Sequence, residues 1–348
     1  MMQCGEPSTR EAVASFINAF CAPNLKIPIN KDQLVLVPGV TYTSDLLSHA
    51  IFDEGDSLIT FAPLYYRFPN DFGDRGLIHV ESIDGYNPAT NTVELNVEKF
   101  EEKFQKLEAE GKPVKAILLV NPRNPDGGVF ALEELKPIVE WAVKKHSLYV
   151  IFDEIYNLTV FDPLPNGQSY ESGIKIFDND SSLDRTKLVW TWGLSKIFSI
   201  PGLRVAAIYS CNERLLKSVN RSLMYQGLNV ITQHFVRELL NDHQWISYFF
   251  QINQQLLKTA KDYCIAALKT FSSPDKTVRF LESQSAFFIL VDFSDFLGAE
   301  KSWDEERKLH QKFKDEKVLI VSGQALFMST PGWFRIVFSS GPKDELLE

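Results

Sequence analysis

Cysteine is scarce in this 348-residue chain, which contains four, and no two of them form a CxxC pair. Cys4, Cys21, Cys211 and Cys264 are scattered, so neither a zinc site nor a disulfide framework is expected, and the thiols are predicted to be reduced. The HExxH and GxSxG motifs are also missing, which leaves little support for a zinc hydrolase or a serine hydrolase. We therefore expect no metal centre.

Long apolar runs and an excess of positive charge are missing as well. The longest wholly apolar run, residues 286–291, is far shorter than the roughly 18 residues of a membrane-spanning helix. The first residues do not combine a basic segment with an apolar stretch, so they do not predict a secretory signal. With 45 acidic and 36 basic residues the net charge is −9, which argues against binding to nucleic acid or anionic membranes. We expect a cytoplasmic protein with neither partner.

Short apolar runs alternate with stretches of helical periodicity over the first part of the chain. The runs lie at residues 34–37, 57–61, 116–120, 148–152, 188–191 and 205–209. Buried strands that alternate with helices predict a mostly parallel sheet with helices on both faces. Ahead of the runs, Ser8 and Glu11 have the spacing of a capping box at the start of a helix.

The pattern changes near residue 222. A long helical stretch precedes a smaller set of elements, namely strands at 287–291, 318–321 and 334–338 and a charged helix near 304–315. At about 150 residues per domain, the length suggests roughly two domains. We place a large α/β domain at residues 1–222 and a small α+β domain at residues 223–348.

Four of the apolar runs are followed by unusual polar sequences. These are PGVTYT at 38–43, NPRNPDGG at 121–128, DEIY at 153–156 and WGLSKIFSIPGLR at 192–204. Each has an ordinary interpretation, since a lone Asn-Pro is usually a turn, a lone aspartate often caps a helix and a lone lysine is usually solvated. Because ligands bind beyond the carboxyl ends of parallel strands, the joint occurrence at strand ends indicates a ligand site.

In this combination the sequence resembles the fold-type I pyridoxal 5'-phosphate (PLP) enzymes, specifically the class I/II aminotransferases and their 1-aminocyclopropane-1-carboxylate (ACC) synthase-like branch. NPRNPDGG matches the family's NPxNPxG, FDEIY its D-E-x-Y, GLSKIFSIPGLR its S-x-S-K…G-x-R and WFRIVFSS its late arginine strand. The resemblance implies a large PLP-binding domain with a mostly parallel sheet and a smaller α+β C-terminal domain. It also implies a homodimer with active sites where the subunits meet, and a small-molecule amino acid substrate.

The resemblance assigns catalytic roles to three residues. Lys196 would form the internal Schiff base with PLP and then act as the general base that moves the Cα proton. Asp153 would pair with the pyridinium nitrogen, and Tyr156 would hydrogen-bond the phenolic oxygen of the ring. A nearby cation, Arg204, would help to lower the pKa of the lysine.

The remaining assignments concern binding. Asn124 would also bond the phenolic oxygen, and it belongs to the expected substrate-binding set as well. Tyr65 would stack on the pyridine ring, or else be an ordinary core or interface tyrosine. Val40, Thr41 and Arg204 would hold the phosphate. Arg335 would grip the substrate α-carboxylate as a two-pronged ion pair.

The sequence also departs from the family pattern. Gly193 stands where the family usually has a serine that donates to the phosphate, a loss of about 1 kcal/mol unless Thr191 or Ser195 replaces the hydroxyl. Gln3 falls where a tyrosine is usual, and we expect the family's N-terminal arm and last helix to be missing. Two interpretations stay open: the sequence is either a shortened gene model or fragment of an active enzyme, or a short protein with reduced or altered activity.

Three functions are compatible with these observations. The complete residue set favours an aminotransferase of amino acid metabolism that moves an amino group from an α-amino acid to a 2-oxo acid. An ACC synthase-like lyase or a C–S lyase, acting on S-adenosylmethionine or a cysteine conjugate, is the second. A PLP-binding relative without enzymatic activity is the third.

Overall fold

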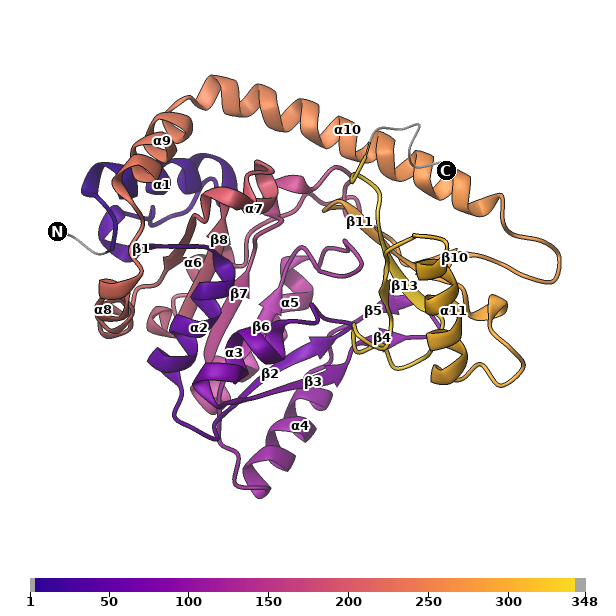
Figure 1. Cartoon of the computed structure of the whole chain (residues 1–348). Helices are drawn as coiled ribbons and strands as arrows, with labels where there is room; N and C mark the ends of the chain where they lie inside the picture. Colours follow the sequence, from indigo (N-terminus) through magenta and orange to yellow (C-terminus); the bar gives the residue numbers. More distant parts are fainter. Residues whose placement is uncertain (1–3, 342–348) are drawn as a thin grey trace.

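The computed structural model describes residues 4–341 and is built around a seven-stranded sheet (Figure 1). Its strands follow the order β1-β9-β8-β7-β6-β2-β3. Their bounds are β1 Leu34–Val37, β2 Ser57–Ala62, β3 His79–Asp84, β6 Val114–Val120, β7 Tyr149–Asp153, β8 Leu188–Gly193 and β9 Ala206–Tyr209. All neighbouring pairs are parallel except those of β9, which runs antiparallel to β8 and to β1. The predicted mostly parallel α/β sheet is confirmed.

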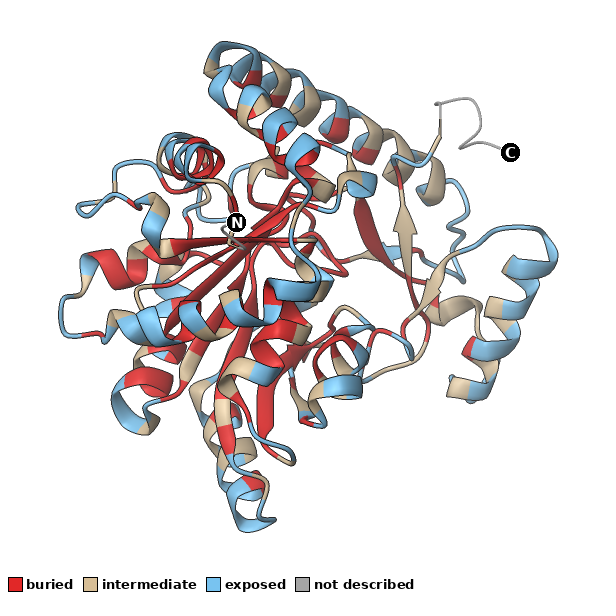
Figure 2. Ribbon diagram, turned by 60° about the vertical axis from the view of Figure 1, so that its left-hand side comes forward, coloured by how far each residue is buried: buried red, intermediate tan, exposed pale blue. Residues whose placement is uncertain are grey.

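Both faces of this sheet are covered. Every residue of β1, β2, β8 and β9 is buried, and successive side chains of a strand point to opposite faces, so helices must shield both sides (Figure 2). One group of helices comprises α2 Val40–Ile51, α3 Phe68–Gly76 and α8 Glu213–Ser222; a second comprises α4 Val97–Ala109, α5 Leu132–Glu140 and α6 Ile174–Asn179. The edge strand β3 has only one buried residue, Ile83, and for that reason its sequence contains no apolar run.

The first helix begins earlier than the capping-box spacing predicts. Helix α1 spans Pro7–Phe16 and continues as a π-helical turn, Ile17–Cys21, with Glu6 as its N-cap and no side-chain cap hydrogen bond. Proline suits the first helical position because its ring fixes a helical φ and its missing N–H would have had no partner there. The predicted Ser8 cap is therefore wrong.

A smaller sheet follows two long helices, α9 Val230–Asn241 and α10 His243–Lys269. Its strands β10 Arg279–Phe280, β11 Phe288–Asp292, β13 Trp333–Val337 and β12 Val321–Ser322 pair antiparallel in that order, beside α11 Trp303–Asp315. A hairpin of β4 Tyr86–Asn87 and β5 Thr92–Val93 forms a third, two-stranded sheet. The strand predicted at 318–321 is reduced to Val321–Ser322, and Val318 and Leu319 are exposed.

The NPRNPDGG loop joins the two larger sheets. The carbonyl of Gly127 accepts hydrogen bonds from the backbone N–H groups of Gln284 and Ser285, both at 2.9 Å, and from the Ser285 hydroxyl at 2.8 Å. The backbone of Gly127 has φ 74°, and a Cβ there would lie 2.3 Å from Ser283 Oγ. Glycine permits this close junction.

The division into domains at residue 222 stays a prediction. Helix α9, which follows that residue, packs against α1 of the large sheet's layer, where Gln233 accepts from the Glu6 N–H. Gln3 lies outside the described residues. Within residues 4–341, none of the helices combines the length and apolarity that crossing a membrane requires.

Candidate active site

The strand ends singled out in the sequence meet at one cavity of about 150 Å³. Asp153 is the last residue of β7, and Lys196 lies in the short helix α7, Leu194–Ile197, directly after β8. All eight residues predicted to contact the cofactor line this cavity, namely Val40, Thr41, Tyr65, Asn124, Asp153, Tyr156, Lys196 and Arg204. Parallel strands that share a carboxyl edge bring these segments together.

Burial sets the charge of the two central groups. Asp153 is 6% exposed, and burial raises the pKa of its carboxyl group to about 7, although the Ile155 N–H donates to Oδ1 at 3.2 Å. Burial also lowers the pKa of the Lys196 ammonium, assisted by the positive charges of Arg335 and then Arg204. Both changes favour the neutral forms, and a neutral amine can accept a proton.

The start of helix α2 and Arg204 form an anion cradle. Gly39 caps the helix with φ 94°, and the first N–H groups of a helix have no partner within it. The guanidinium of Arg204 lies against this turn, donating to the carbonyls of Pro38 at 3.3 Å and Pro201 at 3.1 Å. A Cβ at Gly39 would lie 2.1 Å from Arg204 Nη2, so only glycine leaves the arginine in this position. A helix N-terminus beside a guanidinium suits a phosphate group.

The packing around Gly193 leaves little room for the serine that the family pattern usually has at this position. A Cβ at this position would lie 2.9 Å from the Val205 carbonyl oxygen, closer than side chains normally approach. Of the two candidate replacements, Thr191 already donates to the Phe152 carbonyl at 3.2 Å, whereas Ser195 lines the cavity. Ser195 is thus the better placed hydroxyl.

Arg335 stands beside the cavity but is not among the residues that line it. From β13 it donates through Nη1 to Asn124 Oδ1 at 2.9 Å, and its guanidinium lies over the Phe288 ring at 5.2 Å. Its Nε is buried without a hydrogen-bond partner among the described residues. Burial raises the pKa of the Tyr156 phenol, and the charge of Arg335 opposes that rise. An arginine with a buried unsatisfied donor is suited to a carboxylate ligand.

Several residues of the cavity wall were not predicted from the sequence. Ser44 follows Val40 by one helical turn, and Phe68 and Asp71 follow Tyr65 at intervals of three. Asp71 is 9% exposed and forms an ion pair with Arg67, 3.3 Å from Nε to Oδ1. Helical spacing from Val40 could have found Ser44, whereas Tyr65 lies before α3, so helical spacing would not have found Phe68 and Asp71.

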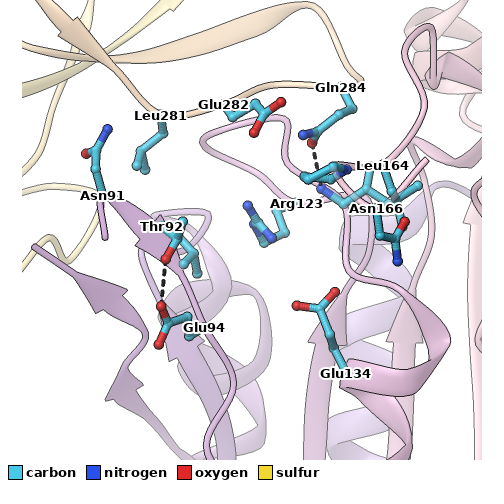
Figure 3. A pocket seen from close by; sticks show the side chains of 13 residues that line it. Asn91, Thr92, Glu94, Arg123, Glu134, Leu164, Asn166, Leu281, Glu282 and Gln284 are labelled. Carbon is cyan, nitrogen blue, oxygen red and sulfur yellow. Dashed lines mark hydrogen bonds between the residues drawn. The ribbon is translucent and has the colours of Figure 1, made fainter. Parts of the chain in front are cut away.

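A different cavity of about 350 Å³ lies at the junction of the sheets (Figure 3). Arg123 enters its wall from the NPRNPDGG loop, with Thr92 and Glu94 on one side and Gln284 on another. Arg123 is already engaged, because its Nε and Nη2 donate to the Asp126 carboxylate at 2.9 and 2.6 Å. In this loop Asn124 therefore lines the cavity that contains Lys196, whereas Arg123 lines the cavity between the sheets and is held there by Asp126.

A doubly wound large sheet, a smaller antiparallel sheet and a lysine and an aspartate sharing one cavity together define the fold-type I class of PLP-dependent enzymes. A comparison of the sequence with known protein families supports the same class. The family model for aminotransferase class I and II matches residues 3–348, and the chain belongs to that family.

Individual relatives narrow the similarity to the ACC synthase-like branch. The mouse 1-aminocyclopropane-1-carboxylate synthase-like protein 1 is 33% identical over 337 residues, which are 95% of this chain and 64% of that protein. A mouse relative named "Probable inactive 1-aminocyclopropane-1-carboxylate synthase-like protein 2" is 31% identical over 342 residues, 96% of this chain and 56% of that protein. The chain thus spans between about half and two thirds of the length of these relatives.

Solved structures support the fold. The aspartate aminotransferase of Rhizobium meliloti superimposes with a TM-score of 0.82 at 18% identity, covering 99% of this chain and 80% of that one. At this identity the likeness establishes the architecture alone.

Proposed function

We propose that the chain is a PLP-dependent aminotransferase that moves an amino group from an α-amino acid to a 2-oxo acid. One observation carries the proposal, namely that Lys196 and Asp153 line the same cavity, beside the anion cradle of α2 and Arg204. If Lys196 and Asp153 lined separate cavities, the structure would not support this proposal.

The residues present fit the cofactor in two respects. The cradle at Gly39, which a Cβ would fill, matches the phosphate, with Val40, Thr41 and Arg204 around it. The buried Asp153 matches the protonated ring nitrogen, because a cation at that place would compensate the carboxylate for its burial. Tyr65 would lie against the ring, and Asn124 and Tyr156 would bond its phenolic oxygen. When bound, PLP supplies an electron sink that stabilises negative charge on the substrate Cα.

The chain itself moves the proton and holds the substrate. In this proposal the amine of Lys196, whose lowered pKa favours the neutral form, would accept the proton from the substrate Cα. Arg335 would bind the α-carboxylate, satisfying its buried Nε. Asn124, which accepts from Arg335, would keep the guanidinium oriented for this contact.

Two other functions have specific support. The similarity to a protein named ACC synthase-like favours a lyase acting on S-adenosylmethionine or a cysteine conjugate. The similarity to a protein named probable inactive favours a PLP-binding relative without turnover. Neither changes the expected attachment of the cofactor at Lys196.

A two-stage experiment separates these possibilities. The purified protein is mixed with PLP, reduced with borohydride and digested, and we expect the modified peptide to contain Lys196. Amino donors are then screened with 2-oxo acids, and S-adenosylmethionine and a cysteine conjugate are tested without any oxo acid. Transfer to an oxo acid supports the aminotransferase, product without an oxo acid the lyase, and labelling without turnover the inactive relative. Absence of label at Lys196 contradicts all three.

We also propose a homodimer in the cytoplasm. Large apolar side chains are exposed on the segment before α9 and on α9 itself, namely Met224, Tyr225, Val230, Ile231 and Phe235. Clustered exposed apolar side chains typically mark an interaction surface. All four cysteines are free, which suits a reducing compartment.

A further inference from the structure

The wall of the candidate cofactor cavity contains a second acidic residue, Asp71, in addition to Asp153. Asp71 lies in the first turn of α3, three residues after Phe68, so the two side chains share one face of the helix. Phe68 lines the same cavity, and its ring packs against that of Tyr65, with 5.3 Å between the ring centres. Helix α3 therefore brings a carboxylate to the wall of the space proposed for PLP.

The Asp71 carboxylate is buried but only partly engaged. Its side chain is 3% exposed, and its Oδ1 accepts a hydrogen bond from Arg67 Nε at 3.3 Å. Within residues 4–341, its Oδ2 accepts no hydrogen bond. The side chain of Arg67 is 49% exposed, so solvent weakens the attraction between the two charges. A cation in the adjoining cavity would therefore stabilise Asp71.

The charge of Asp71 acts at the Asp153 end of the cavity. Burial is the main cause that raises the pKa of the Asp153 carboxyl and of the Tyr65 phenol, and the negative charge of Asp71 adds to both rises. The charges that shift the pKa values of Lys196 and Arg335 come from other residues. Because electrostatic interactions weaken with distance, this pattern indicates that Asp71 lies nearer to Asp153 than to the amine or the guanidinium.

We propose that Asp71 is a second acidic group that acts on the ring nitrogen of the cofactor, and that together with Asp153 it favours the protonated, positively charged form of that nitrogen. The inference rests on the proposed function, in which Asp153 pairs with the nitrogen. Two carboxylates that share a cavity repel each other, and a cation beside them offsets both the repulsion and the cost of burial. Asp71 would thus strengthen the binding of a cationic ring and have little effect on a neutral one.

The 1-deaza analogue of PLP tests the inference, because a C–H group replaces the ring nitrogen and cannot carry the positive charge. Equilibrium dialysis measures the dissociation constants of PLP and of the analogue at about pH 8.5. At that pH the Asp153 carboxyl, with a pKa of about 7, is mostly ionised with or without Asp71. In Asp71→Asn we expect the ratio of the two constants, analogue over PLP, to fall by about fivefold. Retained binding of the analogue shows that the variant is folded.

Two further variants serve as controls. Asp74→Asn makes the same change on α3 at an exposed position outside the cavity wall, and we expect it to leave the ratio unchanged. Arg67→Gln breaks the same ion pair but keeps the charge of Asp71, so we expect the wild-type ratio or a larger one.

Three outcomes would overturn the inference. The first is an unchanged ratio in Asp71→Asn, even if both ligands bind more weakly, since a merely structural role affects both equally. The others are an equal fall of the ratio in Arg67→Gln or in Asp74→Asn. All three leave the proposed function standing, whereas its own failure appears separately as a lack of borohydride-trapped PLP at Lys196.

Discussion

At the scale of single residues, the candidate site depends on Asp153 and Lys196, two side chains whose burial disfavours their charged forms. Asp153 and Lys196 are each pushed toward neutrality before any ligand is bound. A cationic ring nitrogen beside Asp153 would stabilise its ionised carboxylate and so offset part of the cost of burying that charge. A phosphate beside Arg204 would likewise offset the positive charge there. Ligand binding and stability should therefore be coupled at this site.

Removal of the Lys196 amine should abolish both attachment and catalysis. In Lys196→Ala we expect no borohydride-trapped PLP and a turnover at least about 100-fold lower, since a positioned general base commonly contributes that much. Peptide mapping and a single-turnover assay measure the two effects. Unchanged turnover in the variant would contradict the assignment of Lys196 as the base.

The raised pKa of Asp153 predicts how stability depends on pH without PLP. Because the folded state holds this proton up to about pH 7, against an ordinary pKa of 3.8, the stabilisation is complete below about pH 4 and is lost as pH rises through 7. Each tenfold change in proton affinity corresponds to about 1.4 kcal/mol, so the loss amounts to a few kcal/mol. Urea unfolding between pH 4 and 8 should show the wild type losing stability relative to Asp153→Asn.

Wild type and Asp153→Asn differ in this carboxyl group and in its interactions with the charges of Glu154 and Lys196. The neighbouring Glu154, whose pKa burial raises to about 6, is present in both proteins, so the two differ only in Asp153 itself and in the interaction of its charge with neighbours such as Glu154. Asp275→Asn, at an exposed aspartate, is the control and should follow the wild type at every pH. A constant difference between wild type and Asp153→Asn would show that burial does not govern this carboxyl group.

At the scale of elements, the position of α2 depends on the glycine before it. In Gly39→Ala the new methyl group would occupy the space of the Arg204 guanidinium, so the arginine must leave the cradle. We expect affinity for PLP to fall by about tenfold or more, as for the loss of one charge-assisted hydrogen bond. Equilibrium dialysis of PLP measures the effect.

Gly55→Ala provides the control for backbone strain. Gly55 also has a positive φ, 86°, but a Cβ there would meet nothing within 4 Å. Both variants should lose stability from a positive φ, and Gly39→Ala should lose more, about 1–3 kcal/mol, because its φ of 94° and ψ of 156° are nearly restricted to glycine. Only Gly39→Ala should lose PLP affinity, and equal affinities in the two variants would argue against the cradle.

At the scale of the whole molecule, the NPRNPDGG loop holds the small sheet to the large one. In Gly127→Ala the added carbon would collide with Ser283, so the hydrogen bonds to the Gly127 carbonyl should weaken. We expect faster hydrogen exchange at the amides of Gln284 and Ser285. Gly111→Ala, with φ 71° and open space around it, should leave that exchange unchanged.

Association of two copies is the other prediction at this scale. Ile231 is 84% exposed within the apolar segment proposed as the contact surface. Ile231→Asp should weaken self-association by about tenfold or more in sedimentation equilibrium, since it places a charge in an apolar contact. Leu319→Asp, at a side chain that is 85% exposed on the small sheet's side, is the matched control and should sediment like the wild type.

Much of the fold was predictable because its information is local. Fully buried strands have mostly apolar sequences, and β1, Leu34–Val37, coincides with its apolar run. The edge strand β3 was not predictable, because a strand with one buried residue needs no such run. Likewise, Pro7 rather than Ser8 opens α1, since the proline ring already fixes the helical backbone.

The sequence by itself determined which side chains the strand ends carry, because each motif is contiguous with the apolar run that positions it. Tertiary structure alone decided how these side chains meet. It brought Arg335 to Asn124 across 211 residues, closed the space beside Gly193 and set Lys196 and Asp153 in one cavity. The reason is physical, since local sequence sets the backbone of an element, whereas contacts and cavities arise from how elements of distant sequence pack.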